Sequence, residues 1–163
     1  MPIFETDQDR SNEQRIGNYF VKCLGNNYSI SPKLNYKDII DRALLRNNQL
    51  VAWLEIKHRN QNYYTSQGLE ISLHKIKIGI DYLKATKNPF ILIIEFENLI
   101  KYANIKENAL QIFNTYFGGR KNPRPNAPND REMVVEIPID EFQEVRNAKY
   151  LFPEVYVNPS HII

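Results

Sequence analysis

The chain contains very little cysteine: Cys23 is the only one in 163 residues. A single thiol cannot form an internal disulfide, and it excludes a zinc site built from several cysteines. Chains without disulfides are typical of reducing compartments, so we expect an intracellular, cytoplasmic protein. Cys23 also falls on the apolar face of an expected helix with no evident base nearby, which argues against a catalytic thiol.

Long hydrophobic runs are missing as well. No apolar stretch in the sequence reaches the roughly 20 residues that a membrane-spanning helix requires. The first ten residues, MPIFETDQDR, lack the basic start and the apolar segment of a secretion signal. We therefore expect no membrane partner.

Several common catalytic motifs are absent. The sequence has no Gly-x-Ser-x-Gly elbow, no Walker phosphate-binding loop, no dinucleotide-binding fingerprint and no His-Glu-x-x-His pair. These absences argue against serine hydrolases of that type, the common nucleotide-binding enzymes and the best-known zinc proteases. The formal net charge of +2 is small, so it permits nucleic-acid binding without indicating it.

The apolar patterning that is present predicts one α/β domain over residues 1–163, with its core over about 9–97. The run FILIIEF is short and continuously apolar, which is typical of a strand buried on both faces. A strand that follows a helix pairs in parallel through a right-handed crossover. The expected elements are helices at 9–24, 69–86 and 140–148, strands at 28–33, 90–96 and 133–137, a strand hairpin at 36–59, and helical or irregular structure at 99–117.

The hairpin carries charged groups inside apolar strands. Asp41 follows Ile39 and Ile40, while Glu55 and Lys57 lie in the second strand. Buried carboxylates cost free energy unless a cation or a metal ion compensates them. Because strand residues alternate faces, Asp41 comes opposite Glu55 only if the connection is a three-residue loop or contains a bulge. This hairpin is therefore the best candidate for an active site.

Asp41, then thirteen residues, then Glu55-Ile56-Lys57, resembles the PD-(D/E)XK nuclease superfamily, although Ile40 stands where many members have proline. The resemblance implies a restriction-endonuclease-like αβββαβ core, with a mixed sheet flanked by helices. It also implies that Asp41, Glu55 and the backbone carbonyl of Ile56 bind Mg²⁺ or Mn²⁺. Lys57 would then assist the attacking water. Holliday-junction resolvases, small phage nucleases and homing endonucleases are all similar in this respect.

The same resemblance suggests two further catalytic residues. Many superfamily members have a glutamate on the first helix, and Glu13 lies at that position. A lysine on the helix after the Glu-x-Lys strand often approaches the metal, and Lys75 is similarly placed. The alternatives are that Glu13 is an ordinary first-turn acid and that Lys75 faces solvent.

Basic residues provide candidate contacts to nucleic-acid phosphates. Arg59 continues the face of Glu55 and Lys57, and the Gly- and Pro-rich segment 118–131 forms an expected basic loop. These residues could equally well be solvated surface charges. The candidates in the loop are Arg120, Lys121, Arg124 and Arg131.

The sequence thus favours a Mg²⁺-dependent DNA nuclease, and we expect an endonuclease. A chain this small that cuts both strands of a duplex is expected to act as a homodimer or a higher homo-oligomer, and the apolar tail 153–163 could contact a partner subunit. The alternative is a non-catalytic nucleic-acid-binding or assembly module of the same fold, in which the acids serve only as ion-pair partners. Metal binding by Asp41 and Glu55 distinguishes the two.

Overall fold

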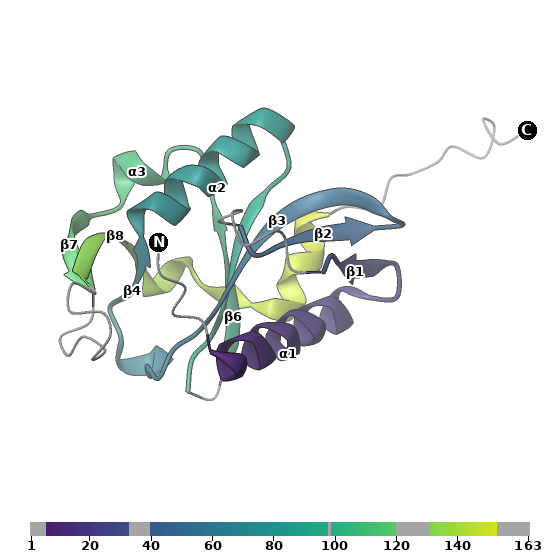
Figure 1. The fold of residues 1–163 in the computed structure, drawn as a ribbon, viewed down its shortest axis with the longest axis horizontal. Coiled ribbons are helices and arrows are strands. Elements are labelled where there is room, and N and C mark those ends of the chain that lie inside the picture. The colour runs from purple at the N-terminus through teal and green to yellow at the C-terminus, as the bar shows by residue number, and fades with distance from the viewer. Residues whose placement is uncertain (1–5, 33–39, 98, 120–130, 153–163) are drawn as a thin grey trace, which may run out of the picture.

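The computed structural model describes residues 6–32, 40–97, 99–119 and 131–152 (Figure 1). A six-stranded mixed sheet forms the centre, and a smaller three-stranded sheet stands beside it. The central sheet has the order β1 (Tyr28–Ile30), β2 (Arg42–Arg46), β3 (Gln49–His58), β5 (Phe90–Glu95), β6 (Ile100–Ile105) and β9 (Gln143–Glu144). The smaller sheet has the order β4 (Gly68–Ser72), β8 (Arg131–Pro138) and β7 (Thr115–Gly119).

Two long helices, α1 (Asp7–Leu24) and α2 (Leu73–Thr86), pack on opposite faces of the central sheet. Ile16 and Phe20 of α1 pack in one core cluster, and Ile76 and Ile80 of α2 pack in the other. We refer to these faces as the α1 side and the α2 side. The shorter helical elements are α3 (Ala109–Ile112) and three 3-10 turns, η1 (Tyr63–Thr65), η2 (Ile139–Glu141) and η3 (Val145–Leu151).

The first predicted helix is confirmed and begins two residues earlier than expected. The Thr6 hydroxyl accepts a hydrogen bond from the Asp9 N–H (3.1 Å), and the Asp9 carboxylate accepts one from the Thr6 N–H (2.9 Å). This capping box satisfies two amides that the helix itself leaves unpaired. The helix ends at Gly25, whose φ of 123° is a conformation that side chains rarely adopt.

The β2–β3 connection is a two-residue turn followed by a bulge. Asn47 and Asn48 both have positive φ, at 51° and 64°, as a tight hairpin turn of this kind requires. The register shifts by one residue just after the turn, so Val51 is the extra residue. Ala43 consequently lies opposite Trp53, which is the pairing that the expected register demanded. Of the two predicted solutions, the bulge is confirmed and the three-residue loop is wrong.

Strand β5 runs parallel to β3 and is buried on both faces, as its continuous apolar run predicted. Leu92 lies beside Glu55, and Ile94 lies beside Lys57. All the isoleucine and leucine side chains of β5 are fully buried. Helix α2 crosses this strand at Gly79, where an added Cβ would lie 2.1 Å from the Phe90 ring. The helix can therefore approach β5 this closely only because residue 79 is a glycine.

Residues 69–72 are a strand, so the helix predicted over 69–86 is wrong for its first turn. Leu69 and Ile71 are buried while Glu70 between them is only half-buried, and this alternation is a strand pattern. The segment pairs with β8 and starts the smaller sheet. Helix α2 begins at Leu73, and the rest of the prediction is confirmed.

Two predictions for the second half of the chain are also wrong. Residues 99–117 were expected to be helical or irregular, yet they contain β6 and the first part of β7, with only the short helix α3 between them. β6 pairs antiparallel with β5 and is covered on both sides, so its burial does not alternate. The helix expected at 140–148 is a pair of 3-10 turns flanking β9, whereas the strand at 133–137 is confirmed within β8. In the described residues, no helix is long and apolar enough to cross a membrane.

Candidate active site

Asp41 lies at the start of β2 and is 8% exposed. Its Oδ2 atom accepts a hydrogen bond from the backbone N–H of Ile56 (2.9 Å). This bond ties the carboxylate to β3 at the residue next to Glu55. The hairpin therefore brings Asp41 to Glu55 and Ile56, as the bulged register requires.

Glu55 is completely buried at the centre of β3. Its Oε1 atom accepts a hydrogen bond from Lys75 Nζ (2.7 Å) and lies 3.2 Å from Lys57 Nζ. Its Oε2 atom is buried and has no hydrogen-bond partner among the described residues. A buried, unsatisfied carboxylate oxygen is costly, so such an atom marks a place for a water molecule, a ligand or an ion.

Lys75 reaches this cluster because it lies in the first turn of α2. The helix starts directly after β4, which places its first turn over the α2 side of β3, where Glu55 and Lys57 project. The sequence left open whether Lys75 approaches the site or faces solvent, and in the structure its ammonium group contacts Glu55. The Lys75 side chain remains 27% exposed.

The two carboxyl groups of the cluster have opposite pKa shifts. Burial and, after it, the neighbouring Glu55 carboxylate raise the pKa of Asp41 to about 7, against the pull of the two lysines. Burial would also raise the pKa of Glu55, but Lys57 and Lys75 outweigh it, and that pKa lies below its ordinary value. In the metal-free protein, Glu55 thus keeps its charge more readily than Asp41 does.

The two lysines differ in the same way. Burial lowers the pKa of Lys57 below its ordinary value, although Glu55 opposes this. Burial acts on Lys75 too, but there the carboxylates of Glu55 and Asp41 outweigh it and raise the pKa. Lys75 is therefore the permanent cation of the cluster, and Lys57 releases its proton more easily.

The oxygen donors at the site fit a hard divalent cation. Asp41 and Glu55 supply carboxylates, and the residue between Glu55 and Lys57 supplies a backbone carbonyl. The described part of the chain holds no group of three His, Cys, Asp or Glu residues that could bind a metal by side chains alone. Such a site would therefore need the Ile56 carbonyl and water as well, an arrangement that Mg²⁺ accepts. The partnerless Glu55 Oε2 is the structural observation that fits this donor set.

Glu13 lies close to the site but faces the α1 side of the sheet. It is buried, and its Oε1 accepts a hydrogen bond from Arg42 Nε (2.9 Å). Arg42 also donates to the Ser31 carbonyl (3.0 Å). The negative charge of Glu13 contributes to the raised pKa of Asp41, so the two groups are electrostatically linked. Its role as a supporting acid stays a prediction.

Arg42 is the residue that the sequence analysis missed. It follows Asp41 directly in an apolar strand, so strict alternation places it on the opposite face, beneath Glu13. A buried arginine needs a carboxylate partner, and this requirement was a usable signal for the pair.

The candidate nucleic-acid contacts are only partly described. Arg59, at the end of β3, is half-buried, donates to the His58 carbonyl (3.3 Å), and lies near enough to Lys57 to help lower the pKa of that lysine. Arg131 starts β8 and has its guanidinium carbon 5.0 Å from the centre of the Phe117 ring. The other three basic residues, Arg120, Lys121 and Arg124, lie outside the described residues.

Comparison with known proteins agrees with this geometry. Over residues 1–145 the sequence matches the family described as "Phage putative PDDEXK endonuclease". The structure is similar to that of the Holliday junction resolvase Hjc from Archaeoglobus fulgidus, an archaeal hyperthermophile, with a TM-score of 0.58 and 10% sequence identity. The likeness covers 91% of this chain and 100% of the resolvase, and it confirms the predicted fold class. No curated protein matches the sequence.

Proposed function

This chain belongs to the family of phage PDDEXK endonucleases, and we propose that it is a divalent-metal-dependent DNA endonuclease. The observation that carries the proposal is the buried Glu55, which has lysines at one carboxylate oxygen and no partner at the other. A carboxylate that served only the fold would gain by satisfying both oxygens.

Asp41, Glu55 and the carbonyl of Ile56 would hold a Mg²⁺ or Mn²⁺ ion. Such an ion, when bound, stabilises negative charge on the phosphate and lowers the pKa of water. The hydrogen bond from the Ile56 N–H holds the Asp41 carboxylate at the edge of this site. The hairpin would thus hold these groups in position before any ion arrives.

Lys57 is the residue proposed to act on the attacking water. Its ammonium group lies 3.2 Å from Glu55 Oε1, on the same face of β3. From there it can orient the water or accept a proton from it, and it can stabilise charge on the phosphate. Lys75 holds Glu55 Oε1 at 2.7 Å and so leaves the other oxygen of Glu55 for the ion. Glu13 is hydrogen-bonded to Arg42, the residue after Asp41, and would act on Asp41 only through its charge.

DNA is the proposed substrate, and the name of the structurally similar Holliday junction resolvase supports it. Arg59 and Arg131 are the described basic residues that would contact phosphates, together with Arg120, Lys121 and Arg124. Since a site of this size acts on one strand, cleavage of both strands of a duplex would require a homodimer or a higher homo-oligomer.

The second candidate is a binding module without catalysis. It is favoured by one observation: Lys57 and Lys75 already neutralise Glu55 without a metal ion. In that case the lysines would stay paired with the carboxylate, and added Mg²⁺ or Mn²⁺ would not bind.

The test is cleavage of supercoiled plasmid, linear duplex, single strand and four-way junction, each with Mg²⁺, Mn²⁺ or EDTA. Wild type should cut at least one substrate with metal and none with EDTA. Glu55→Gln and Lys57→Met should lose cutting, while Glu95→Gln, a carboxylate variant on the neighbouring strand and outside the cluster, should retain it. Cutting by Glu55→Gln at the wild-type rate would contradict the proposed site.

A further inference from the structure

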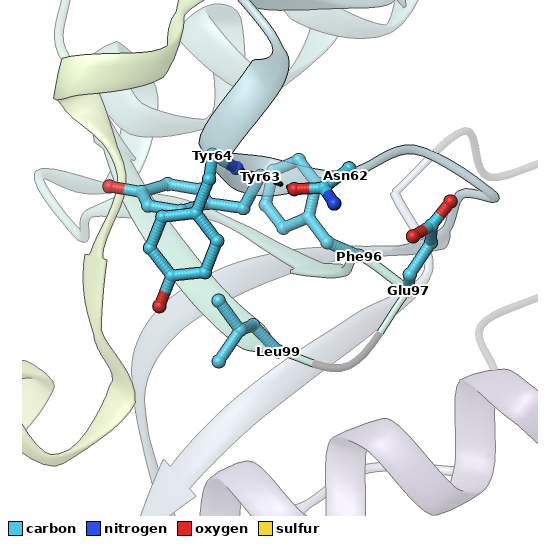
Figure 2. A pocket seen from close by; sticks show the side chains of 6 residues that line it. All are labelled: Asn62, Tyr63, Tyr64, Phe96, Glu97 and Leu99. Atoms are coloured by element: carbon cyan, nitrogen blue, oxygen red, sulfur yellow. Dashed lines mark hydrogen bonds between the residues drawn. The ribbon is translucent and has the colours of Figure 1, made fainter.

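A shallow hollow lies at the ends of β3 and β5, outside the carboxylate cluster (Figure 2). Half of its lining residues are aromatic, and the large ring of Tyr64 is on a residue that is 79% exposed. Figure 2 shows Tyr64 on one side of the hollow and the Glu97 carboxylate on the other. The lining residues are Asn62, Tyr63, Tyr64, Phe96, Glu97 and Leu99.

The Tyr64 ring is held on a structured turn. Its backbone N–H donates to the side chain of Asn62 (2.9 Å), and the Ser66 hydroxyl donates to the Asn62 carbonyl (2.5 Å). The Tyr63 ring packs edge-on between its neighbours, 5.3 Å from Tyr64 and 5.4 Å from the buried Phe96. An exposed ring that is already fixed loses little conformational entropy when another ring stacks on it.

The hollow lies beyond the carboxylate cluster in the direction in which β3 and β5 run. Ile94 lies beside Lys57, and Phe96, just after the end of β5, belongs to the same core cluster on the α2 side. With about 3.3 Å per residue along a strand, Phe96 is about 7 Å beyond the level of Lys57. A DNA strand that runs through the site toward Arg59 would therefore pass the hollow within a few nucleotides of the cut.

The charges around the hollow favour a base over a phosphate. The exposed Glu97 carboxylate would repel a phosphate, but it can accept a hydrogen bond from the amino group of adenine, cytosine or guanine. The amide of Asn62 offers donors to base edges. The Lys101 ammonium group lies 4.4 Å from the centre of the Tyr63 ring, so its charge is directed at that ring.

We propose that Tyr64 is a stacking platform for an unpaired nucleobase next to the cleaved phosphate. The substrate would then be DNA with an unpaired nucleotide at the cut, such as a branch, flap or bulge, rather than continuous duplex. A base inside an intact duplex is stacked on both sides and cannot reach the platform without being unstacked. This inference rests on the proposed nuclease function.

The platform can be tested without cleavage, by measuring binding in EDTA. The probe is a short single strand carrying the fluorescent base 2-aminopurine, titrated with wild type, Tyr64→Leu and Tyr64→Phe. Tyr64→Leu should bind about tenfold more weakly, and Tyr64→Phe should bind like wild type because it keeps the ring. Tyr150→Leu is the matched control, since Tyr150 is 73% exposed and lies on η3, which contacts α1 on the other side of the sheet.

Cleavage then tests the substrate class. With Mn²⁺, Tyr64→Leu should lose about tenfold on a flap or bulge substrate and little on continuous duplex. Equal effects of Tyr64→Leu and Tyr150→Leu in the binding titration would overturn the platform, whatever the cleavage result. If the protein still cut DNA with metal in that case, the proposed nuclease function would stand without the stacking platform. If the 2-aminopurine strand bound as expected but no substrate was cut, the nuclease function would be wrong and the platform would stand.

Discussion

Two buried glutamates on opposite faces of the central sheet differ in how their charge is compensated. Glu13, on the α1 side, is paired with the buried guanidinium of Arg42 at 2.9 Å. Glu55, on the α2 side, has Lys57 and Lys75 at one oxygen, and its other oxygen has no partner among the described residues. The two residues have nearly the same burial, at 6% and 0% exposed.

The difference shows that two carboxylates of nearly equal burial can have very different partners. A guanidinium presents several donors in a fixed plane, so it satisfies a carboxylate well and keeps it in place. Lysine ammonium groups are single points of charge on flexible stems, and those at Glu55 are about one-quarter exposed. The α2 side is therefore the side at which an ion or a substrate phosphate can enter.

The largest effect should come from Glu55→Gln, which keeps the shape of the side chain and removes its charge. Loss of a metal-binding carboxylate should reduce single-turnover DNA cleavage at least about a thousandfold. Circular dichroism should show an unchanged fold. Cleavage within tenfold of wild type would contradict the proposal that Glu55, unlike Glu13, is needed for the reaction.

Glu13→Gln should affect stability far more than chemistry. Removing one partner of a buried ion pair leaves Arg42 uncompensated, which should cost about 3 kcal/mol in the free energy of unfolding. Urea denaturation measures this cost, and adding Arg42→Met to the variant should recover part of it. Cleavage by the folded variant at low temperature should stay within a few-fold of wild type. A large loss of cleavage at full stability would instead make Glu13 the supporting acid of the site.

Metal should stabilise the protein through Glu55 and not through Glu13. At a hundred times its dissociation constant, a bound ion adds about 2.7 kcal/mol, which for a chain of this size raises the unfolding midpoint by about 5 °C or more. Thermal unfolding with Mn²⁺ and with EDTA measures the shift. Glu13→Gln should show the same shift from a lower starting midpoint, and Glu55→Gln should show none. An equal shift in both variants would place the ion elsewhere.

Asp41 should also give the metal-free protein a pH-dependent stability, without any change in the contacts of the two glutamates. Burial first, and then the charge of Glu55, raise the pKa of Asp41 to about 7 in the folded state, against about 3.9 in an unfolded chain. The folded protein therefore binds a proton that the unfolded chain has lost, so this contribution is complete below about pH 4 and disappears as the pH rises through 7.

The measurement is urea unfolding in EDTA, for wild type and for Asp41→Asn, between pH 4 and 8. The difference in unfolding free energy, wild type minus variant, should fall with rising pH by about 1.4 kcal/mol for each unit between the unfolded and folded pKa, or roughly 2–4 kcal/mol in all. Saturating Mg²⁺ should reverse the trend, because an ion favours the charged carboxylate. A difference that stays constant with pH would show that Asp41 is not desolvated.

The parts of the site that depend on local sequence patterns could be predicted from the sequence. Asp41 and Glu55 could be placed together because strand alternation and the short turn restrict the register, and the bulge at Val51 follows from that restriction. The Glu13–Arg42 pair could not be foreseen with certainty, since it joins a helix to a strand 29 positions away. β4 was missed for a similar reason: its short apolar pattern runs directly into that of α2, and only pairing with β8 distinguishes them.

The most direct test of Glu55 as a metal ligand is a count of Mn²⁺ ions bound per chain, by electron paramagnetic resonance, in wild type, Glu13→Gln and Glu55→Gln. Wild type and Glu13→Gln should bind Mn²⁺ with similar affinity, and Glu55→Gln should lose that binding. Unchanged Mn²⁺ binding in Glu55→Gln would contradict this role, because the ion would then not depend on the Glu55 oxygen that has no partner among the described residues.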